Sequence, residues 1–213
     1  MTGAFEPPPP SCPLCPRLVE YRSANQTTHA DWFNGAVPSF GPLEAALLVV
    51  GLAPGVKGAN RTGRPFTGDY AGVLLYQTLI KFGLADGTYG ADPGDGMTLR
   101  DCRVTNAVRC VPPANLPSPQ EITTCNRFLA AEMAAMPRLR AVLALGGVAH
   151  RAVLRARGLR ASRATFAHGA LHALPDGVLL ADSYHVSRLN TNTGRLTQIM
   201  FEAVVADILL QLR

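Results

Sequence analysis

Four short strand-like segments alternate with segments of helical character, and this order strongly limits the folds open to the chain. The segments that we interpret as strands are residues 45–50, 102–108, 141–145 and 178–181, and the first of them is a continuous apolar run. Helices are predicted at residues 69–83, 119–135, 148–157 and 197–212. Strands that alternate with helices form a parallel sheet with helices on both faces. The sequence therefore predicts an α/β fold, a three-layer α/β/α sandwich whose central sheet has four strands and is mostly parallel.

The size and composition of the chain suit one domain with a sizeable core. The chain has 213 residues, and 47% of them are hydrophobic. Residues 1–11, rich in proline, are predicted to form a disordered arm, and residues 12–213 a single domain. No apolar run reaches about 18 residues, and the first ten residues lack a basic segment followed by an apolar one. We therefore expect a cytoplasmic protein without a membrane segment.

The balance of charge allows a polyanionic partner. The formal net charge is +5 and the isoelectric point is about 9.2. A mildly basic protein can bind nucleic acid, but many proteins with such a charge do not. The charge therefore leaves the partner open.

Unusual residues gather where three of the predicted strands end. The first strand runs into Gly-Leu-Ala-Pro-Gly at 51–55, the second carries Asn106, and the fourth is followed by His185. Open α/β sheets bind ligands at the carboxyl ends of their strands, and small residues there let a ligand reach backbone N–H groups. Each segment taken alone also fits an ordinary connecting loop. Together they predict a site at this edge of the sheet.

The five cysteines are an odd number, and in an intracellular protein they indicate metal binding or catalysis before disulfides. Cys12 and Cys15 form a C-x-x-C pair, and Cys110 and Cys125 follow much later in the chain. Four thiolates suit zinc or a [4Fe–4S] cluster, so the spacing leaves both open, as well as four unrelated buried thiols. Cys102 lies inside a predicted strand and is interpreted as a core thiol.

Several motifs follow one another along residues 12 to about 200. They are Cys-Pro-Leu-Cys at 12–15, Gly-Leu-Ala-Pro-Gly at 51–55, Gly-Ala-Asn-Arg-Thr-Gly-Arg-Pro-Phe-Thr-Gly-Asp at 58–69, Thr-Asn-Ala-Val-Arg-Cys-Val-Pro-Pro-Ala-Asn at 105–115, Cys125, and His-Val-Ser-Arg-Leu-Asn-Thr-Asn-Thr-Gly-Arg at 185–195. In this order they resemble the uracil-DNA glycosylase superfamily, in particular its iron–sulfur members and most closely family 5. One such motif would be weak, but the whole series is specific.

The resemblance implies a monofunctional DNA glycosylase of base excision repair, which cleaves the N-glycosidic bond of uracil in DNA and leaves an abasic site. It also implies that the first C-x-x-C pair, Cys110 and Cys125 hold a [4Fe–4S] cluster, and that the enzyme is a monomer. Family 5 implies a roomy pocket that also accepts hypoxanthine and other deaminated or modified bases. A narrow uracil-only enzyme of family 4 type is the alternative, and Leu52 counts against it.

The resemblance assigns recognition of the flipped base to four residues: Ala53, Gly55, Phe66 and Asn106. Phe66 would stack on the base, and the amide of Asn106 would donate and accept hydrogen bonds at its edge. Backbone N–H groups near Ala53 and Gly55 would bond to the base oxygens. Without the resemblance, Phe66 would be read as a packing residue and Asn106 as a turn or cap residue.

His185 and Asp69 are the candidates for catalysis. As the bond breaks, the base leaves as an anion, and a neutral His185 can donate to its carbonyl oxygen. Positions 52 and 53, where many relatives place a carboxylate or an amide, are Leu and Ala here. Asp69 is the nearest carboxylate after this motif and could orient the water or stabilise the sugar cation. Asp69 also fits the N-cap of the next helix, and a water without assistance is the alternative.

Residues 186–195 resemble the DNA-insertion loop of the family. Leu189 or Arg188 would fill the gap left by the flipped base. Contacts to phosphate are expected from polar and basic side chains, namely Ser187, Asn190, Arg61, Arg64 and Arg195.

Two alternatives belong to other classes of protein. A DNA-binding module stabilised by zinc or an iron–sulfur cluster, without catalysis, would explain the charge and the cysteines. It leaves His185, Asn106 and Phe66 without a purpose. A redox protein is the other alternative, and a cluster that cycles without DNA would support it.

Overall fold

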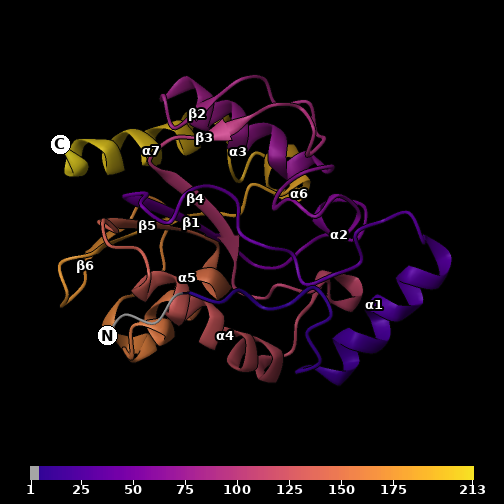
Figure 1. Cartoon of the computed structure of the whole chain (residues 1–213). Coiled ribbons are helices and arrows are strands. Elements are labelled where there is room, and N and C mark those ends of the chain that lie inside the picture. Colours follow the sequence, from indigo (N-terminus) through magenta and orange to yellow (C-terminus); the bar gives the residue numbers. More distant parts are fainter. Residues whose placement is uncertain (1–4) are drawn as a thin grey trace.

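A five-stranded sheet lies at the centre of the computed structural model, which describes residues 5–213 (Figure 1). Its strands, in spatial order, are β4 (Cys102–Asn106), β1 (Leu47–Gly51), β5 (Ala141–Leu145), β7 (Leu179–Ser183) and β6 (Leu171–Ala173). The first four are parallel to their neighbours, and β6 is antiparallel to β7. The prediction of a mostly parallel α/β sheet is confirmed, and the four predicted strands are the four parallel ones.

The fifth strand is the difference from the four-stranded prediction. β6 has three residues, and the side chains of Leu171 and Ala173 are exposed. A strand so short and exposed carries no apolar run in the sequence, so periodicity cannot reveal it. It forms because the chain folds back on β7, where His172 pairs with Leu180.

Helices cover both faces of the sheet. The helices are α3 (Tyr70–Lys81) and α7 (Gln198–Leu212) on one face, and α4 (Pro119–Ala134) and α5 (Gly147–Ala156) on the other. Successive residues of β1 enter opposite cores, because side chains of a strand alternate between its faces. Leu47 and Val49 lie in the core with α3 and α7, whereas Leu48 and Val50 lie in the core with α4 and α5.

The remaining elements lie outside the three layers. They are α1 (Pro16–Thr28), α2 (Ala59–Thr62), α6 (Arg188–Asn192), the hairpin of β2 (Ala85–Asp86) and β3 (Thr98–Leu99), and the short 3-10 turns Pro113–Asn115 and Ala161–Arg163. Within residues 5–213, none of the helices is both long and apolar enough to cross a membrane.

Part of the N-terminal arm packs against the domain. Pro8 is buried, and the carbonyl of Pro10 accepts a hydrogen bond from the N–H of Ala36 at 2.9 Å. The N–H of Cys12 donates to the carbonyl of Pro9, also at 2.9 Å. These contacts differ from the disordered arm predicted over residues 1–11, of which residues 1–4 lie outside the described part of the chain. The contact between Pro10 and Ala36 could not be predicted from the local sequence, because it joins two segments that are separated along the chain.

Candidate active site and cysteine site

The predicted base-binding and catalytic residues come together at the carboxyl ends of the strands. Two adjoining cavities lie there, and both are lined by Ala53, Gly55, Asp69, Ala71 and His185. One cavity is further lined by Leu52, Tyr70, Asn115, Ser187 and Arg188, and the other by Pro54, Ala59, Phe66 and Asn106. The parallel order of the sheet causes this, since it brings the ends of β1, β4 and β7 to one edge.

Gly51, at the end of β1, is the residue over which two of these side chains meet. A Cβ at this position would lie 2.4 Å from Asn106 Oδ1 and 2.4 Å from Phe66 Cζ. Gly51 and Asn106 are register partners in the β1–β4 pair, which sets the amide beside the glycine. Glycine is therefore required here by space, because any side chain would displace the amide and the ring.

Phe66 lies in the wall of the smaller cavity in a strained backbone conformation. Its φ is +52°, in the left-handed region that bulky residues rarely adopt. The side chain is buried, and its ring lies 5.9 Å from the ring of His185, centroid to centroid. An aromatic face next to a histidine suits a planar heterocycle.

Hydrogen-bonding groups remain free at the cavity for a planar ligand. Asn106 Oδ1 is buried and has no partner among residues 5–213. The backbone N–H groups of Ala53 and Gly55 likewise have no acceptor within that part of the chain. A buried polar atom without a partner is unfavourable, so it marks a place where a ligand supplies the missing bond. The cavity thus offers a ligand one hydrogen-bond acceptor, Asn106 Oδ1, and two donors, the N–H groups of Ala53 and Gly55.

Asp69 is both the N-cap of α3 and a wall of the site. Its Oδ1 accepts from the N–H of Ala71 at 3.1 Å, which confirms the capping role. A Cβ added at Gly58 would lie 2.2 Å from Asp69 Oδ2, and one at Gly55 would lie 3.0 Å away. Burial raises the pKa of Asp69, and the N–H groups of Ala71 and Gly72 partly oppose that rise. The carboxylate is thus held close to the backbone of the first motif.

His185 follows β7 and is neutral at physiological pH. Burial lowers its pKa to about 4, because a charged imidazolium is disfavoured away from water. The Nδ2 of Asn190 donates to the carbonyl of His185 at 2.8 Å and ties α6 to this residue. Gly146, at the end of β5, faces it, since a Cβ there would lie 3.7 Å from the His185 Cβ. The ring can therefore donate a hydrogen bond without carrying charge.

The predicted DNA-insertion loop contains the short helix α6 beside the site. Leu189 is 73% exposed, although leucine usually packs inside. Arg188 lines the larger cavity. Ser187 caps α6 by accepting from the N–H of Asn190 at 3.4 Å, so two of the predicted DNA contacts also stabilise the loop. The guanidinium of Arg195 lies over the ring of Tyr184, 4.6 Å from its centroid.

One expected phosphate contact is wrong. Arg64 is buried and forms a two-pronged ion pair with Asp95, with N–O distances of 2.8 and 2.7 Å. The sequence could not show this, because its partner belongs to the turn-rich segment between β2 and β3. Arg61, in contrast, is exposed and lies along α2.

Sequence reasoning missed several lining residues, namely Tyr70, Ala71 and Asn115. Asn115 belongs to the motif at 105–115 and has a left-handed backbone, with φ of +57°. The position of Asn115 in that motif could have identified it as a site residue from the sequence.

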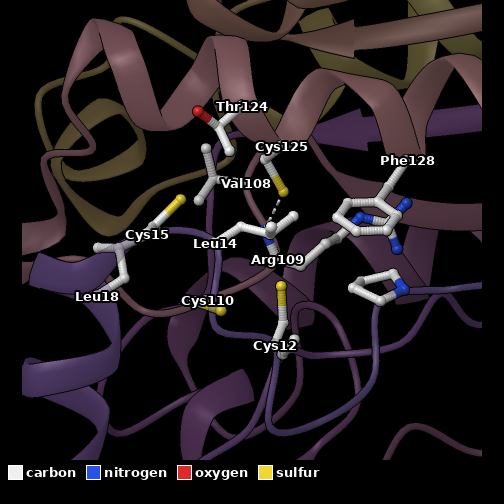
Figure 2. Close-up of a pocket in the computed structure, with 12 residues that line it drawn as sticks. Cys12, Leu14, Cys15, Leu18, Val108, Arg109, Cys110, Thr124, Cys125 and Phe128 are labelled. Atoms are coloured by element: carbon white, nitrogen blue, oxygen red, sulfur yellow. Dashed lines mark hydrogen bonds between the residues drawn. The ribbon is translucent and has the colours of Figure 1, made fainter.

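The four predicted cysteine ligands gather in one pocket, which Figure 2 shows. Cys15 precedes α1, Cys110 follows β4 and Cys125 lies in α4, with Cys12 completing the set. Ala53 packs against the same group, so the pocket adjoins the first motif. Cys102 lies elsewhere, fully buried in the main core, as predicted.

The spacing of the sulfurs differs from that of four thiolates around one zinc ion. Among the described residues, no three cysteine sulfurs all lie within 4.8 Å of one another. A single tetrahedral zinc would hold its sulfurs about 3.8 Å apart. The sulfurs are therefore not arranged as in a preformed tetrahedral zinc site, and four thiolates can also bind a cluster of iron and sulfide.

Two arginines direct donors toward these sulfurs. Arg22 Nη1 lies 3.1 Å from Cys110 Sγ, and the N–H of Arg109 lies 3.4 Å from Cys125 Sγ. Burial raises the pKa of Cys110 to about 11, although Arg22 opposes this, and burial also raises the pKa of Cys125. Thiolates at these positions would therefore be stabilised by additional positive charge, such as that of a metal group.

A second group of potential ligands pairs internally. His150, His172 and Asp182 have ligand atoms within 4.8 Å of one another. Both ring nitrogens of His150 face acceptors, Asp182 Oδ1 at 2.8 Å and the Ala164 carbonyl at 3.0 Å. Burial opposes protonation of His150, but Asp182 raises its pKa above the ordinary value. The group is thus a buried hydrogen-bonded cluster that holds the 164–168 segment on β7.

Comparison with known proteins agrees with this geometry. Residues 38–209 match the model of the "Uracil DNA glycosylase superfamily". The chain belongs to the uracil-DNA glycosylase superfamily. A protein named type-5 uracil-DNA glycosylase from Thermus thermophilus is 45% identical over 202 residues, which is 92% of each chain. Another of the same name, from Pyrobaculum aerophilum, is 44% identical over 88% of this chain and 83% of its own.

Relatives of another type in the superfamily are more distant. A type-4 uracil-DNA glycosylase from Pyrobaculum aerophilum is 30% identical, over 72% of this chain and 64% of its own. The expected resemblance to the superfamily, and to its family 5 in particular, is confirmed. The superfamily match includes every predicted site residue except Cys12 and Cys15, which precede it.

Proposed function

We propose that this protein is a monofunctional uracil-DNA glycosylase of type 5, which hydrolyses the N-glycosidic bond between uracil and deoxyribose in DNA. The observation that carries the proposal is the unpartnered oxygen of Asn106 beside the Phe66 ring, in a cavity with His185 and Asp69. A flipped uracil can stack on Phe66 and donate its N3–H to Asn106 Oδ1. The N–H groups of Ala53 and Gly55 are available for the base oxygens.

Departure of the base requires stabilisation of negative charge. The bond between C1′ of the sugar and N1 of uracil breaks, and its electron pair leaves with the base. His185, neutral because its pKa is about 4, donates its ring N–H to the carbonyl oxygen that gains charge. A neutral donor suits this role, since its proton stays on the imidazole while the leaving base remains an anion.

Attack by water completes the reaction. The oxygen of water bonds to C1′, which has become cation-like, and its proton passes to the carboxylate of Asp69. Asp69 lies beside Gly55 and Gly58, and it is the one carboxylate that lines the two cavities described here. Asn115 lines the larger cavity and has an amide that can orient the same water.

The positions of the lysines support a glycosylase that does not cut the DNA strand. The chain has two lysines, Lys57 and Lys81, and neither lines the cavities. A Schiff-base mechanism needs a desolvated amine at the sugar, and neither lysine is placed to supply one. The product is therefore an abasic site in an intact strand.

The pocket is also suited to bases larger than uracil. The shared lining residues Ala53, Gly55 and Ala71 are small, so a purine such as hypoxanthine meets no bulky side chain from them. This supports removal of hypoxanthine and other deaminated bases in addition to uracil.

The four cysteines would hold a [4Fe–4S] cluster that has a structural role. When bound, the cluster supplies positive charge and four bonds that tie α1, the segment after β4 and α4 together. The hydrogen bonds from Arg22 and Arg109 would stabilise the ligating sulfurs. Leu189, exposed on α6, would fill the gap in the duplex, with Arg188, Ser187, Asn190 and Arg195 near the phosphates.

Base release from duplexes that contain one uracil or one hypoxanthine tests the proposal, using protein whose iron content has been measured. Release of both bases, with abasic sites in uncut strands, is expected. Release of uracil alone would show a narrow pocket. A folded, iron-loaded protein that binds DNA and releases no base would be a DNA-binding module without catalysis.

A further inference from the structure

The left-handed backbone of Phe66 is held by hydrogen bonds from outside the catalytic group. A non-glycine residue with φ of +52° stays in that conformation only where its surroundings impose it. The hydroxyl of Tyr89 donates to the Phe66 carbonyl at 3.0 Å, and the hydroxyl of Tyr76 donates to the Pro65 carbonyl at 2.6 Å. Two successive carbonyls are therefore fixed by two tyrosines.

The backbone of α3 leaves room for this arrangement at Gly72. A Cβ there would lie 1.8 Å from the Phe66 carbonyl oxygen and 2.1 Å from the Tyr89 hydroxyl oxygen. Neither approach is possible for a residue with a side chain. The hydrogen bond thus lies directly against the backbone of α3 and is partly buried.

The segment that carries Tyr89 is itself anchored beside Phe66. Asp95 accepts both prongs of Arg64, and also the N–H groups of Gly90 at 2.9 Å and Met97 at 3.0 Å. Arg64 lies two residues before Phe66, so one ion pair joins the two segments. Its guanidinium lies 6.0 Å from the centroid of the Tyr89 ring.

We propose that Tyr89 is a positioning residue for the base-stacking wall, because its hydroxyl holds the Phe66 carbonyl and so sets the angle at which the Phe66 ring faces the flipped base. This inference rests on the proposed function and adds a residue that does not line either cavity. Tyr89 acts through Phe66 and needs no contact with DNA. Burial raises the pKa of Tyr89, so its hydroxyl remains a donor at neutral and moderately alkaline pH.

The test uses Tyr89→Phe, which removes one hydroxyl and leaves the ring in place. Two quantities are measured, the single-turnover rate of uracil release, and the affinity for a duplex with an uncleavable 2′-fluoro-2′-deoxyuridine relative to an undamaged duplex. The rate and the relative affinity are each expected to fall about fivefold, the value of one typical hydrogen bond, with affinity for undamaged DNA unchanged. The matched control Tyr21→Phe removes a hydroxyl from α1, remote from the site, and should change neither quantity.

A double-mutant cycle shows whether Tyr89 acts through Phe66. In a Phe66→Ala background, Tyr89→Phe is expected to have no further effect on either quantity. An equal fivefold loss in both backgrounds would overturn the inference, as would unchanged values for the single variant, or an equal loss of affinity for damaged and undamaged duplexes. A wild-type protein that prefers the 2′-fluoro duplex but releases no uracil would contradict the proposed function, while the affinity measurement would still decide the role of Tyr89.

Discussion

The rings of Phe66 and His185 lie 5.9 Å apart, centroid to centroid, with their planes inclined by 31°. They come from loops after β1 and β7, two strands separated in the sheet by β5. A stacking face and a neutral hydrogen-bond donor thus lie at one cavity. The proposed reaction needs both at the same base, the first to hold it and the second to stabilise its departing charge.

Asp69→Asn should separate catalysis from helix capping. Asparagine caps helices about as well as aspartate, so the melting temperature should change little. The rate of uracil release should fall about 100-fold or more, because an amide cannot take the proton of water. Burial raises the pKa of Asp69, so the wild-type rate should fall in acid as the carboxyl protonates, and the variant should lack that fall. A rate close to wild type in single-turnover assays would favour an unassisted water.

The stability of the protein in acid should depend on His185. Its pKa in the folded state is about 4, below the ordinary 6.5, so between these values the unfolded chain binds a proton that the folded state does not. Stability from this residue is complete above pH 6.5 and is lost as pH falls toward 4, by about 2 kcal/mol at pH 5. His185→Gln should lose less stability between pH 7.5 and pH 5, as measured by urea unfolding. An equal loss in both proteins would contradict the prediction.

Iron content should distinguish the cluster cysteines from the core cysteine. Cys110→Ser removes a proposed ligand that receives the Arg22 hydrogen bond, and should reduce iron well below four per chain, along with the visible absorbance. Cys102→Ala is the matched control, because Cys102 is fully buried in another core. It should retain the iron and lose only about 1–2 kcal/mol of unfolding free energy. Zinc in place of iron in the wild-type protein would contradict the proposed cofactor.

Leu189→Ala should slow base release from duplex DNA more than from single strands, since the side chain would fill a gap that only a duplex has. Leu189 is 73% exposed, so its removal should change the unfolding free energy by no more than about 0.5 kcal/mol. Leu210→Ala, near the C-terminal end of α7 and 60% exposed, is the control and should not change either rate. If Leu189→Ala slows both substrates equally, Arg188 becomes the better candidate for the wedge.

The parallel sheet was predictable because β1 and β5 are continuous apolar runs buried on both faces, and because strand-like segments alternate with helical ones along the chain. The motifs around Asn106 and His185 were also recognisable from the sequence. Each is a short contiguous segment at the end of one strand, so its pattern does not depend on distant residues. The antiparallel β6 escaped prediction, because its three residues owe their conformation to β7 and not to their own pattern.

The sequence by itself determined the order of the four parallel strands and of the four helices that cover them. It also marked four cysteines as candidate ligands and placed the candidate site residues at the strand ends. Only the tertiary structure decided which charges face solvent and which side chains share a cavity. Arg64 forms a buried ion pair with Asp95, and Asn115 lines the larger cavity. The hydroxyl of Tyr89 donates a hydrogen bond to the carbonyl of Phe66. Each of these relationships joins segments far apart in the chain. Local propensity does not encode them, because their free energy comes from burial and pairing that exist only once the layers have packed.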